Sequence, residues 1–98
     1  MKPIDFRGSI LIAAAAASLL LSASTAQAAD KVRFLIDWAF QVRGLYRVEW
    51  HCRTDNLASS NVARRLGLQH EATLRSSYPW KGVRHDTEIW AVLAEDWK

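Results

Sequence analysis

Residues 44–68 read GLYRVEWHCRTDNLASSNVARRLGL, and this stretch joins a strand pattern to a helix pattern through a short polar cap. In its first part, apolar side chains alternate with charged ones from residue 46 to residue 53. Successive side chains of a strand point to opposite faces, so this alternation predicts a half-buried strand. The side chains expected to face the core are Tyr46, Val48, Trp50 and Cys52.

A helix is expected at residues 57–66. Asn56 precedes it, and an Asn in this position accepts a hydrogen bond from a free backbone amide of the first turn. Arg64 lies in the last turn, where a cation complements the helix dipole, and Gly67 follows as a stop signal. The buried stripe is expected to recur every four residues, as Ala58, Val62 and Leu66.

Two further strand patterns follow the helix. Residues 70–78 alternate up to Pro79, residues 79–82 (PWKG) have the composition of a turn, and residues 87–94 alternate again. Residues 44–98 therefore predict a strand, a helix and a β-hairpin. The side chains expected to share a face are Ala72, Leu74, Ser76 and Tyr78 in the first of these strands, and Ile89, Ala91 and Leu93 in the second.

Residues 31–44 (KVRFLIDWAFQVRG) precede the first strand, and their apolar side chains fit both the helical and the strand period. Phe34 and Trp38 fall at helical spacing, but the same segment also alternates as a strand would. We expect a helix at residues 34–41, because the strand and helix that follow supply its packing partners. Gly44 gives a break after it, as a glycine often does at the end of a helix.

Residues 1–28 have the organisation of an export signal. Two basic residues, Lys2 and Arg7, precede an uncharged apolar run at residues 9–21, and the segment ends in the small-residue pattern AQA at Ala28. A membrane-spanning helix needs roughly 20 apolar residues, so this run is too short to span a bilayer comfortably. We expect cleavage after Ala28; the alternatives are an uncleaved anchor and an Ala-rich soluble helix.

The composition is that of one small globular domain. The chain has 98 residues, of which 50% are hydrophobic, and a net charge of +3. Without the expected signal, 11 basic and 9 acidic residues remain, and the basic ones are scattered, which argues against a nucleic-acid partner. Cys52 is the single cysteine, so no internal disulfide holds the fold. One core of this size supplies about 3–5 kcal/mol.

The residues that could take part in catalysis or bind a metal do not form a recognisable cluster in the sequence. The three histidines stand 19 and 15 residues apart, so no metal site is expected. Cys52 and His51 are strand neighbours that point to opposite faces, and we expect Cys52 to be a buried structural residue. Asp86 is a candidate base, but we favour its pairing with Arg75 or Arg84 across the hairpin.

Four motifs follow one another from residue 44 towards the end of the chain. They are GLYRVEWHC at residues 44–52, NLASSNVARRLGL at residues 56–68, EATLR at residues 71–75 and LAEDW at residues 93–97. The second is similar to the segment N-x-x-S-x-x-V-A-x-[RK]-x-G-[FL]. Together, the four resemble the C-terminal half of GNAT-superfamily N-acetyltransferases, most closely the RimJ/RimL type that acetylates ribosomal-protein N-termini.

The resemblance implies an α/β (α+β) fold, with a helix-strand-helix-hairpin unit and a small mixed three-stranded sheet. The signal helix expected from residues 1–28 precedes this unit. It also implies acetyl transfer from acetyl-CoA to the amine of a protein or a small molecule. By this resemblance Asn56 lies beside the pantetheine arm, Ser59 is the catalytic acid that protonates the departing thiolate, and Arg64 lies near the CoA phosphates. The alternative interpretations are a plain helix cap for Asn56 and an ordinary surface hydroxyl for Ser59.

The family's glycine-rich turn, [RQ]-x-x-G-x-[GA], holds the acetyl-CoA pyrophosphate at a helix N-terminus and has no counterpart in this sequence. Residues 41–46 (QVRGLY) are the nearest match, but they end in Tyr46 and lead into a strand. The strand that contacts the pantetheine and the family's N-terminal half also lack counterparts. The resemblance therefore implies an acetyltransferase-related fragment whose activity is impaired or lost.

Residues 29–41 (ADKVRFLIDWAFQ) resemble the mature start of periplasmic solute-binding proteins of ABC transporters. We therefore divide the chain into a signal peptide at residues 1–28, a seam segment at residues 29–44 and a partial GNAT domain at residues 45–98. Such a chain joins an export signal to half of an acetyltransferase. Two alternatives are an exported fragment of a solute-binding protein and a small secreted interaction module.

The two resemblances imply different places in the cell. The signal predicts export to the periplasm or beyond, whereas the acetyltransferase resemblance implies the cytoplasm. The expected partners are acetyl-CoA and an amine substrate, without nucleic acid and without a stable membrane span. A small sheet that lacks its neighbouring strands exposes an edge, and this edge predicts a homodimer or aggregation.

Overall fold

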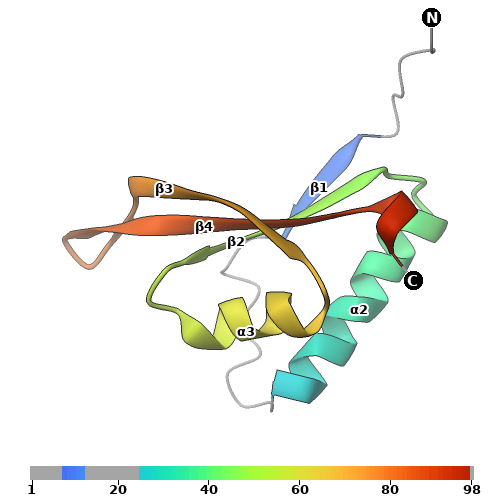
Figure 1. Ribbon diagram of the computed structural model, residues 1–98, viewed down its shortest axis with the longest axis horizontal. Coiled ribbons are helices and arrows are strands. Elements are labelled where there is room, and N and C mark those ends of the chain that lie inside the picture. Colours follow the sequence, from blue (N-terminus) through green and yellow to red (C-terminus); the bar gives the residue numbers. More distant parts are fainter. Residues whose placement is uncertain (1–7, 13–24, 98) are drawn as a thin grey trace, which may run out of the picture.

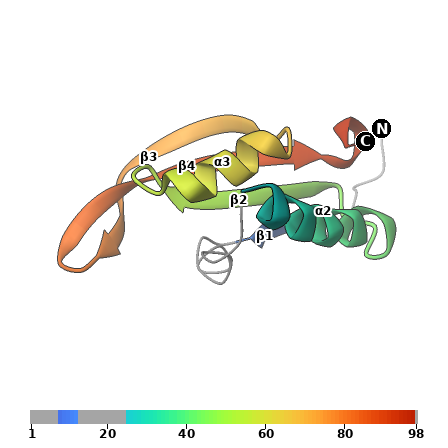
Figure 2. The ribbon, with the colours of Figure 1, turned by 90° about the horizontal axis from the view of Figure 1, so that it is seen from below.

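The computed structural model describes residues 8–12 and 25–97 of the chain. Its elements, in chain order, are β1 (Ser9–Ile12), α2 (Thr25–Gln41), β2 (Arg47–Arg53), α3 (Leu57–Arg65), β3 (Gln69–Trp80), β4 (Val83–Leu93) and the 3-10 turn η1 (Ala94–Asp96). The strands form one sheet in the order β1-β2-β4-β3 (Figure 1). Helices α2 and α3 pack on the same face of this sheet (Figure 2). The fold therefore has two layers, as expected for a small α+β unit.

The two central strands, β2 and β4, are antiparallel and carry the core. Val48, Trp50 and Cys52 of β2 are fully buried, which confirms the core face that the alternation predicted. Tyr46, the fourth member of that expected face, precedes β2 and is exposed. Trp90 of β4 lies directly opposite Trp50 in register, so the two indoles share the face that the helices cover.

Helix α2 confirms the helix expected at residues 34–41 and begins nine residues earlier, at Thr25. The residues buried on its inner side are Ala28, Ala29, Val32, Ile36 and Ala39. They recur at the spacing of an amphipathic helix, so packing on the sheet decides between the two periods that the sequence allowed. The expected cleavage point after Ala28 lies within this buried side. Gly44, with φ of 66°, follows the helix as the expected break.

Helix α3 confirms the helix expected after Asn56, but its buried stripe is different from the expected one. Ala58 is exposed, and Ser59 is buried in its place. The residues that α3 buries, with its C-cap, are Ser59, Ser60, Val62, Ala63 and Leu66. A serine can face the core when its hydroxyl is hydrogen-bonded. The expected stripe was based on apolar residues alone, so it included Ala58 instead of Ser59.

Strands β3 and β4 form the expected β-hairpin, and both are longer than their sequence patterns indicated. The turn consists of Lys81 and Gly82, whose φ values of 50° and 76° are those of a tight two-residue hairpin connection. Pro79 and Trp80, which we expected in the turn, belong to β3 instead. Because so short a connection suffices, the strands run on to the tip of the hairpin (Figure 1).

Strand β1 is the element that the sequence patterns did not predict. The expected signal helix covers residues 1–28, but Ser9–Ile12 form a short strand that pairs in parallel with β2 from Arg47 to Trp50. This pairing satisfies backbone groups at the edge of β2 and extends the expected three-stranded sheet to four strands. The features expected at residues 13–24 lie outside the described residues. None of the described helices is long and apolar enough to cross a membrane.

Candidate functional site

Asn56 and Ser59, two of the predicted site residues, lie together at the first turn of α3. Asn56 Oδ1 accepts a hydrogen bond from the backbone N–H of Ser59 at 3.2 Å, which confirms the predicted helix cap. The Asn56 carbonyl oxygen accepts a second bond from the N–H of Ser60 at 3.1 Å. The first bond satisfies a donor that a helix N-terminus otherwise leaves free, so Asn56 has a structural task in this fold.

The Ser59 side chain points into the protein and is 1% exposed. Its Oγ accepts a hydrogen bond from Trp50 Nε1 at 2.9 Å, and the Ser59 carbonyl oxygen lies 3.2 Å from the same nitrogen. Trp50 is fully buried, and a buried indole N–H requires an acceptor. The hydroxyl of Ser59 therefore connects α3 to β2 beneath the protein surface.

Polar contacts continue from this point across the central strands. Cys52 Sγ donates to Glu88 Oε1 at 3.8 Å, and Trp90 Nε1 donates to the same oxygen at 3.0 Å. Burial raises the pKa of the Cys52 thiol to about 11, while the nearby Ser59 hydroxyl acts in the opposite direction and the Glu88 carboxylate adds to the rise. A thiol with this pKa is protonated at neutral pH, so Cys52 is not poised as a nucleophile.

Arg64, the third predicted site residue, lies on the last turn of α3. Its guanidinium group is 5.5 Å from the centre of the Trp90 ring, and its Nη1 donates to Asn61 Oδ1 at 2.7 Å. Eight residues separate it from Asn56, which is about 12 Å along an α-helix. The structure thus brings Asn56 and Ser59 together and leaves Arg64 at the other end of the helix.

A charged cluster that the sequence patterns missed lies on the sheet face opposite the helices. Arg47 Nη2 is 2.7 Å from Glu71 Oε1, and Arg47 Nε is 2.8 Å from Glu49 Oε2. His51 Nε2 lies 2.9 Å from the other oxygen of Glu49. The hydrogen bond from Arg47 lowers the pKa of both carboxyl groups, and His51 lowers that of Glu49 further. Alternation in β2 places Arg47, Glu49 and His51 on one face, as the sequence pattern predicts, but Glu71 is 24 residues from Arg47 and its pairing has no local signal.

We expect this cluster to make the stability of the fold depend on acid pH. Because the pKa values of Glu49 and Glu71 are lowered in the folded chain, their stabilising effect is present above about 4.5, the ordinary value, and is lost as the pH falls through the folded-state values. The effect is modest, since both carboxylates are partly exposed. Arg47→Met should flatten the pH dependence of the urea midpoint, whereas Arg75→Met should not. Equal pH dependence in wild type and Arg47→Met would contradict the assignment.

The histidines lie at separate places in the fold. His51 belongs to the charged cluster, the His70 ring stacks on Trp90 at 5.1 Å between centroids, and His85 Nδ1 is 3.8 Å from Asp55 Oδ2. The part of the chain that the structure describes has no group of three or more side chains arranged to hold a metal ion.

Asp86 has a backbone partner rather than the expected arginine. Its Oδ1 accepts a hydrogen bond from the N–H of Ser76 at 2.8 Å. Ser76 has φ of 51° and lies where the register of β3 shifts, between Leu74 and Tyr78. Asp86 therefore supports an irregular segment of the edge strand, which is a structural task.

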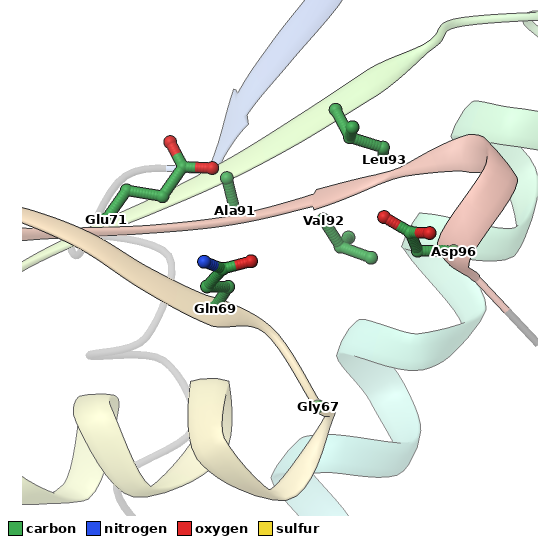
Figure 3. A pocket seen from close by; sticks show the side chains of 7 residues that line it. All are labelled: Gly67, Gln69, Glu71, Ala91, Val92, Leu93 and Asp96. Atoms are coloured by element: carbon green, nitrogen blue, oxygen red, sulfur yellow. The ribbon is translucent and has the colours of Figure 1, made fainter.

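A hollow of about 250 Å³ opens where β3 begins and β4 ends (Figure 3). It is lined by Gly67, Gln69, Glu71, Ala91, Val92, Leu93 and Asp96. The Glu71 carboxylate is already paired with Arg47. Gly67 follows the C-terminal end of α3, about 12 Å along the helix from Ser59. The hollow is therefore not a continuation of the turn that holds Asn56 and Ser59.

Proteins similar to this chain are N-acetyltransferases. YjcK of Bacillus subtilis, a probable N-acetyltransferase, is 31% identical over 67 residues, which are 68% of this chain and 37% of YjcK. A probable acetyltransferase of the GNAT family from Chromobacterium violaceum superposes with a TM-score of 0.67 at 38% identity, over 71% of this chain and 35% of its own. A GCN5-related N-acetyltransferase from Brucella melitensis gives 0.68 at 33% identity, over 80% of this chain and 35% of its own.

These similarities confirm the GNAT resemblance and the mixed α+β class that the sequence motifs implied, over about 70% of the chain. The chain spans less than half the length of each of the three proteins. No protein-family model matches its sequence. The described residues therefore form a partial GNAT fold, with α3 and its Asn56 cap as the segment that carries the predicted site.

Proposed function

We propose that this chain is a GNAT-type N-acetyltransferase unit that by itself binds acetyl-CoA weakly and does not transfer its acetyl group at a measurable rate. The transferase class is supported by the relatives, which are named as N-acetyltransferases. The lack of measurable transfer is supported by one observation above all, the burial of Ser59 beneath the surface with its hydroxyl bonded to Trp50. A general acid must reach the group that it protonates, and this hydroxyl faces the core.

The side chains assigned to acetyl-CoA by resemblance already have hydrogen-bond partners within the fold. Asn56 Oδ1 is bonded to the first turn of its own helix, and Ser59 Oγ is bonded to Trp50. The guanidinium group of Arg64 is bonded to Asn61. An acetyl-CoA group that took the place of these internal partners would cost the fold about 0.5–1.5 kcal/mol for each hydrogen bond replaced.

A phosphate site is also missing from the turn that the sequence offers for it. Residues 41–46 lead from the end of α2 into β2, as expected, and no helix begins there. Backbone amides bind phosphate well where a helix N-terminus leaves them free, and at α3 the Asn56 side chain already accepts from one of them. Weak cofactor binding is therefore the outcome that this chain's own donors favour.

A CoA-release assay on the full chain tests the proposal. The acceptor is a short peptide with a free N-terminal amine, because the resemblance of residues 56–68 to the RimJ/RimL segment favours that class. Ellman's reagent detects the thiol of released CoA, and we expect no release above the rate without protein. Release that disappears in Ser59→Ala and persists in Ser60→Ala, a neighbouring buried hydroxyl, would overturn the proposal and assign Ser59 the role of general acid.

A further inference from the structure

The segment expected to be an export signal, residues 1–28, contributes two elements to the fold, and we call it the leader segment. Residues 9–12 of this segment form β1, which pairs in parallel with residues 47–50 of β2 (Figure 1). Residues 25–28 form the start of α2. Cleavage after Ala28 would separate both pieces from the rest of the chain.

The expected cleavage bond, between Ala28 and Ala29, lies inside the folded core. Ala28 is 3% exposed and Ala29 is 2% exposed, and both belong to the apolar cluster that joins α2 to the sheet. The bond also lies within a helix, since α2 begins at Thr25. Peptidases cut exposed or locally unfolded chain, and a packed helix must open before its backbone can be reached. The folded chain therefore does not present this bond.

We propose that folding and removal of the leader segment exclude each other, so that the folded protein retains this segment and the bond after Ala28 can be cut only before the chain folds. In the unfolded chain, the leader segment offers a basic start, an apolar run and a small-residue cleavage pattern. In the folded chain, residues 9–12 are a strand and residues 25–28 are helical. The same residues cannot serve both purposes at one time.

Strand β1 completes the sheet beside β2. In the strand order β1-β2-β4-β3, β2 has β4 on one side and β1 on the other. The pairing with β1 extends to Trp50, which is fully buried, and the N–H of Tyr46 donates to the carbonyl oxygen of Gly8 at 3.0 Å. Without β1, backbone groups on this side of β2 lose their partners, and β2 becomes an exposed edge. A chain cut after Ala28 is therefore less stable than the full chain.

Digestion by a purified leader peptidase tests the proposal on the full chain. Such a peptidase cuts after small-residue patterns like that of residues 26–28. A synthetic peptide of residues 1–35 contains the same bond and has no β2 to pair with, so we expect it to be cut. The full chain should be cut after Ala28 at least about tenfold more slowly than the peptide, because the rate follows the population of opened chain. Mass spectrometry of the products gives both rates.

Two variants of the full chain show whether the fold causes this resistance. Trp50→Ala leaves the leader segment unchanged and removes a fully buried side chain from the core, so it should be cut at nearly the rate of the peptide. Trp80→Ala is the matched control, since Trp80 is 47% exposed, and it should be cut at the wild-type rate. Hydrogen exchange of the wild-type chain is an independent measurement. Amides of residues 9–12 should exchange at least about tenfold more slowly in buffer than in urea.

Four results would overturn the proposal. The first is a full chain that is cut as fast as the peptide, because the bond would then be open in the folded state. The second is a peptide that is not cut, since folding would then have no processing to oppose. The third is an equal cleavage rate for Trp50→Ala and Trp80→Ala. The fourth is exchange at residues 9–12 as fast in buffer as in urea, which would remove β1 from the fold.

Discussion

Replacement of Trp50 by alanine is expected to unfold the chain. The side chain is fully buried between the sheet and α3, and its indole N–H binds the Ser59 hydroxyl. Truncation of a buried Trp to Ala costs about 3–5 kcal/mol, which is as much as one core of this size supplies. The loss is larger than for any exposed aromatic residue, because a cavity forms and the acceptor at Ser59 loses its donor.

Urea denaturation followed by far-UV circular dichroism measures this effect. Trp80→Ala is the matched control, since Trp80 is 47% exposed near the tip of the hairpin, with the charged groups of Arg53 and Lys81 at 5.0 and 5.7 Å from the centre of its ring. We expect the control to lose less than about 1 kcal/mol. A cooperative transition of Trp50→Ala at nearly the wild-type urea midpoint would mean that the core is not centred on β2.

The thiol of Cys52 is expected to react at least about a hundredfold more slowly in the folded chain than in urea. It is fully buried, and its pKa of about 11 is above the ordinary value of 9.0. Alkylation therefore requires an opening of the fold, and the thiolate fraction is small before that opening occurs. Because the pKa of this acid is raised on folding, the stability that it contributes is complete below about 9 and is lost as the pH rises towards 11.

Iodoacetamide labelling followed by mass spectrometry gives the two rates. The control is Thr73→Cys in the same chain, because Thr73 is exposed on β3 and its cysteine should react at nearly the same rate with and without urea. A native rate for Cys52 as fast as that of the control cysteine would contradict the packing of β2 under α3. Ellman's reagent can then be used in the CoA-release assay without a background from Cys52.

The elements that the sequence predicted well are those whose local signals agree. Alternation in β2 and the Asn56 cap before α3 each depend on a few neighbouring residues, and both are confirmed. Local signals also predicted the hairpin. Its strands are longer than predicted, because the turn consists of only Lys81 and Gly82. These features need no knowledge of distant contacts, which is why a single sequence sufficed.

The features that the sequence did not predict depend on residues far apart in the chain. Strand β1 exists through its pairing with β2, and the Arg47–Glu71 ion pair joins residues on different strands. The choice between Ala58 and Ser59 for the buried side of α3 was decided by an indole N–H nine residues away, at Trp50. Tertiary hydrogen bonds of this kind leave no periodic mark in the sequence.

The candidate site also combines features that are local to α3 with features that depend on tertiary packing. The cap role of Asn56 could be predicted, because it is local to α3. The burial of Ser59 and the position of Arg64 over the Trp90 ring could not be predicted, since both depend on how α3 lies on the sheet. The family motif indicated three candidate residues, and the packing determines what each of them contacts in this chain.

Calorimetric titration of the full chain with acetyl-CoA tests the central claim most directly. We expect no saturable heat up to ~1 mM ligand, because Asn56 Oδ1, Ser59 Oγ and Arg64 Nη1 each have a partner within the fold and the sequence has no counterpart of the family's glycine-rich turn. Saturable binding with a dissociation constant in the micromolar range would contradict this expectation.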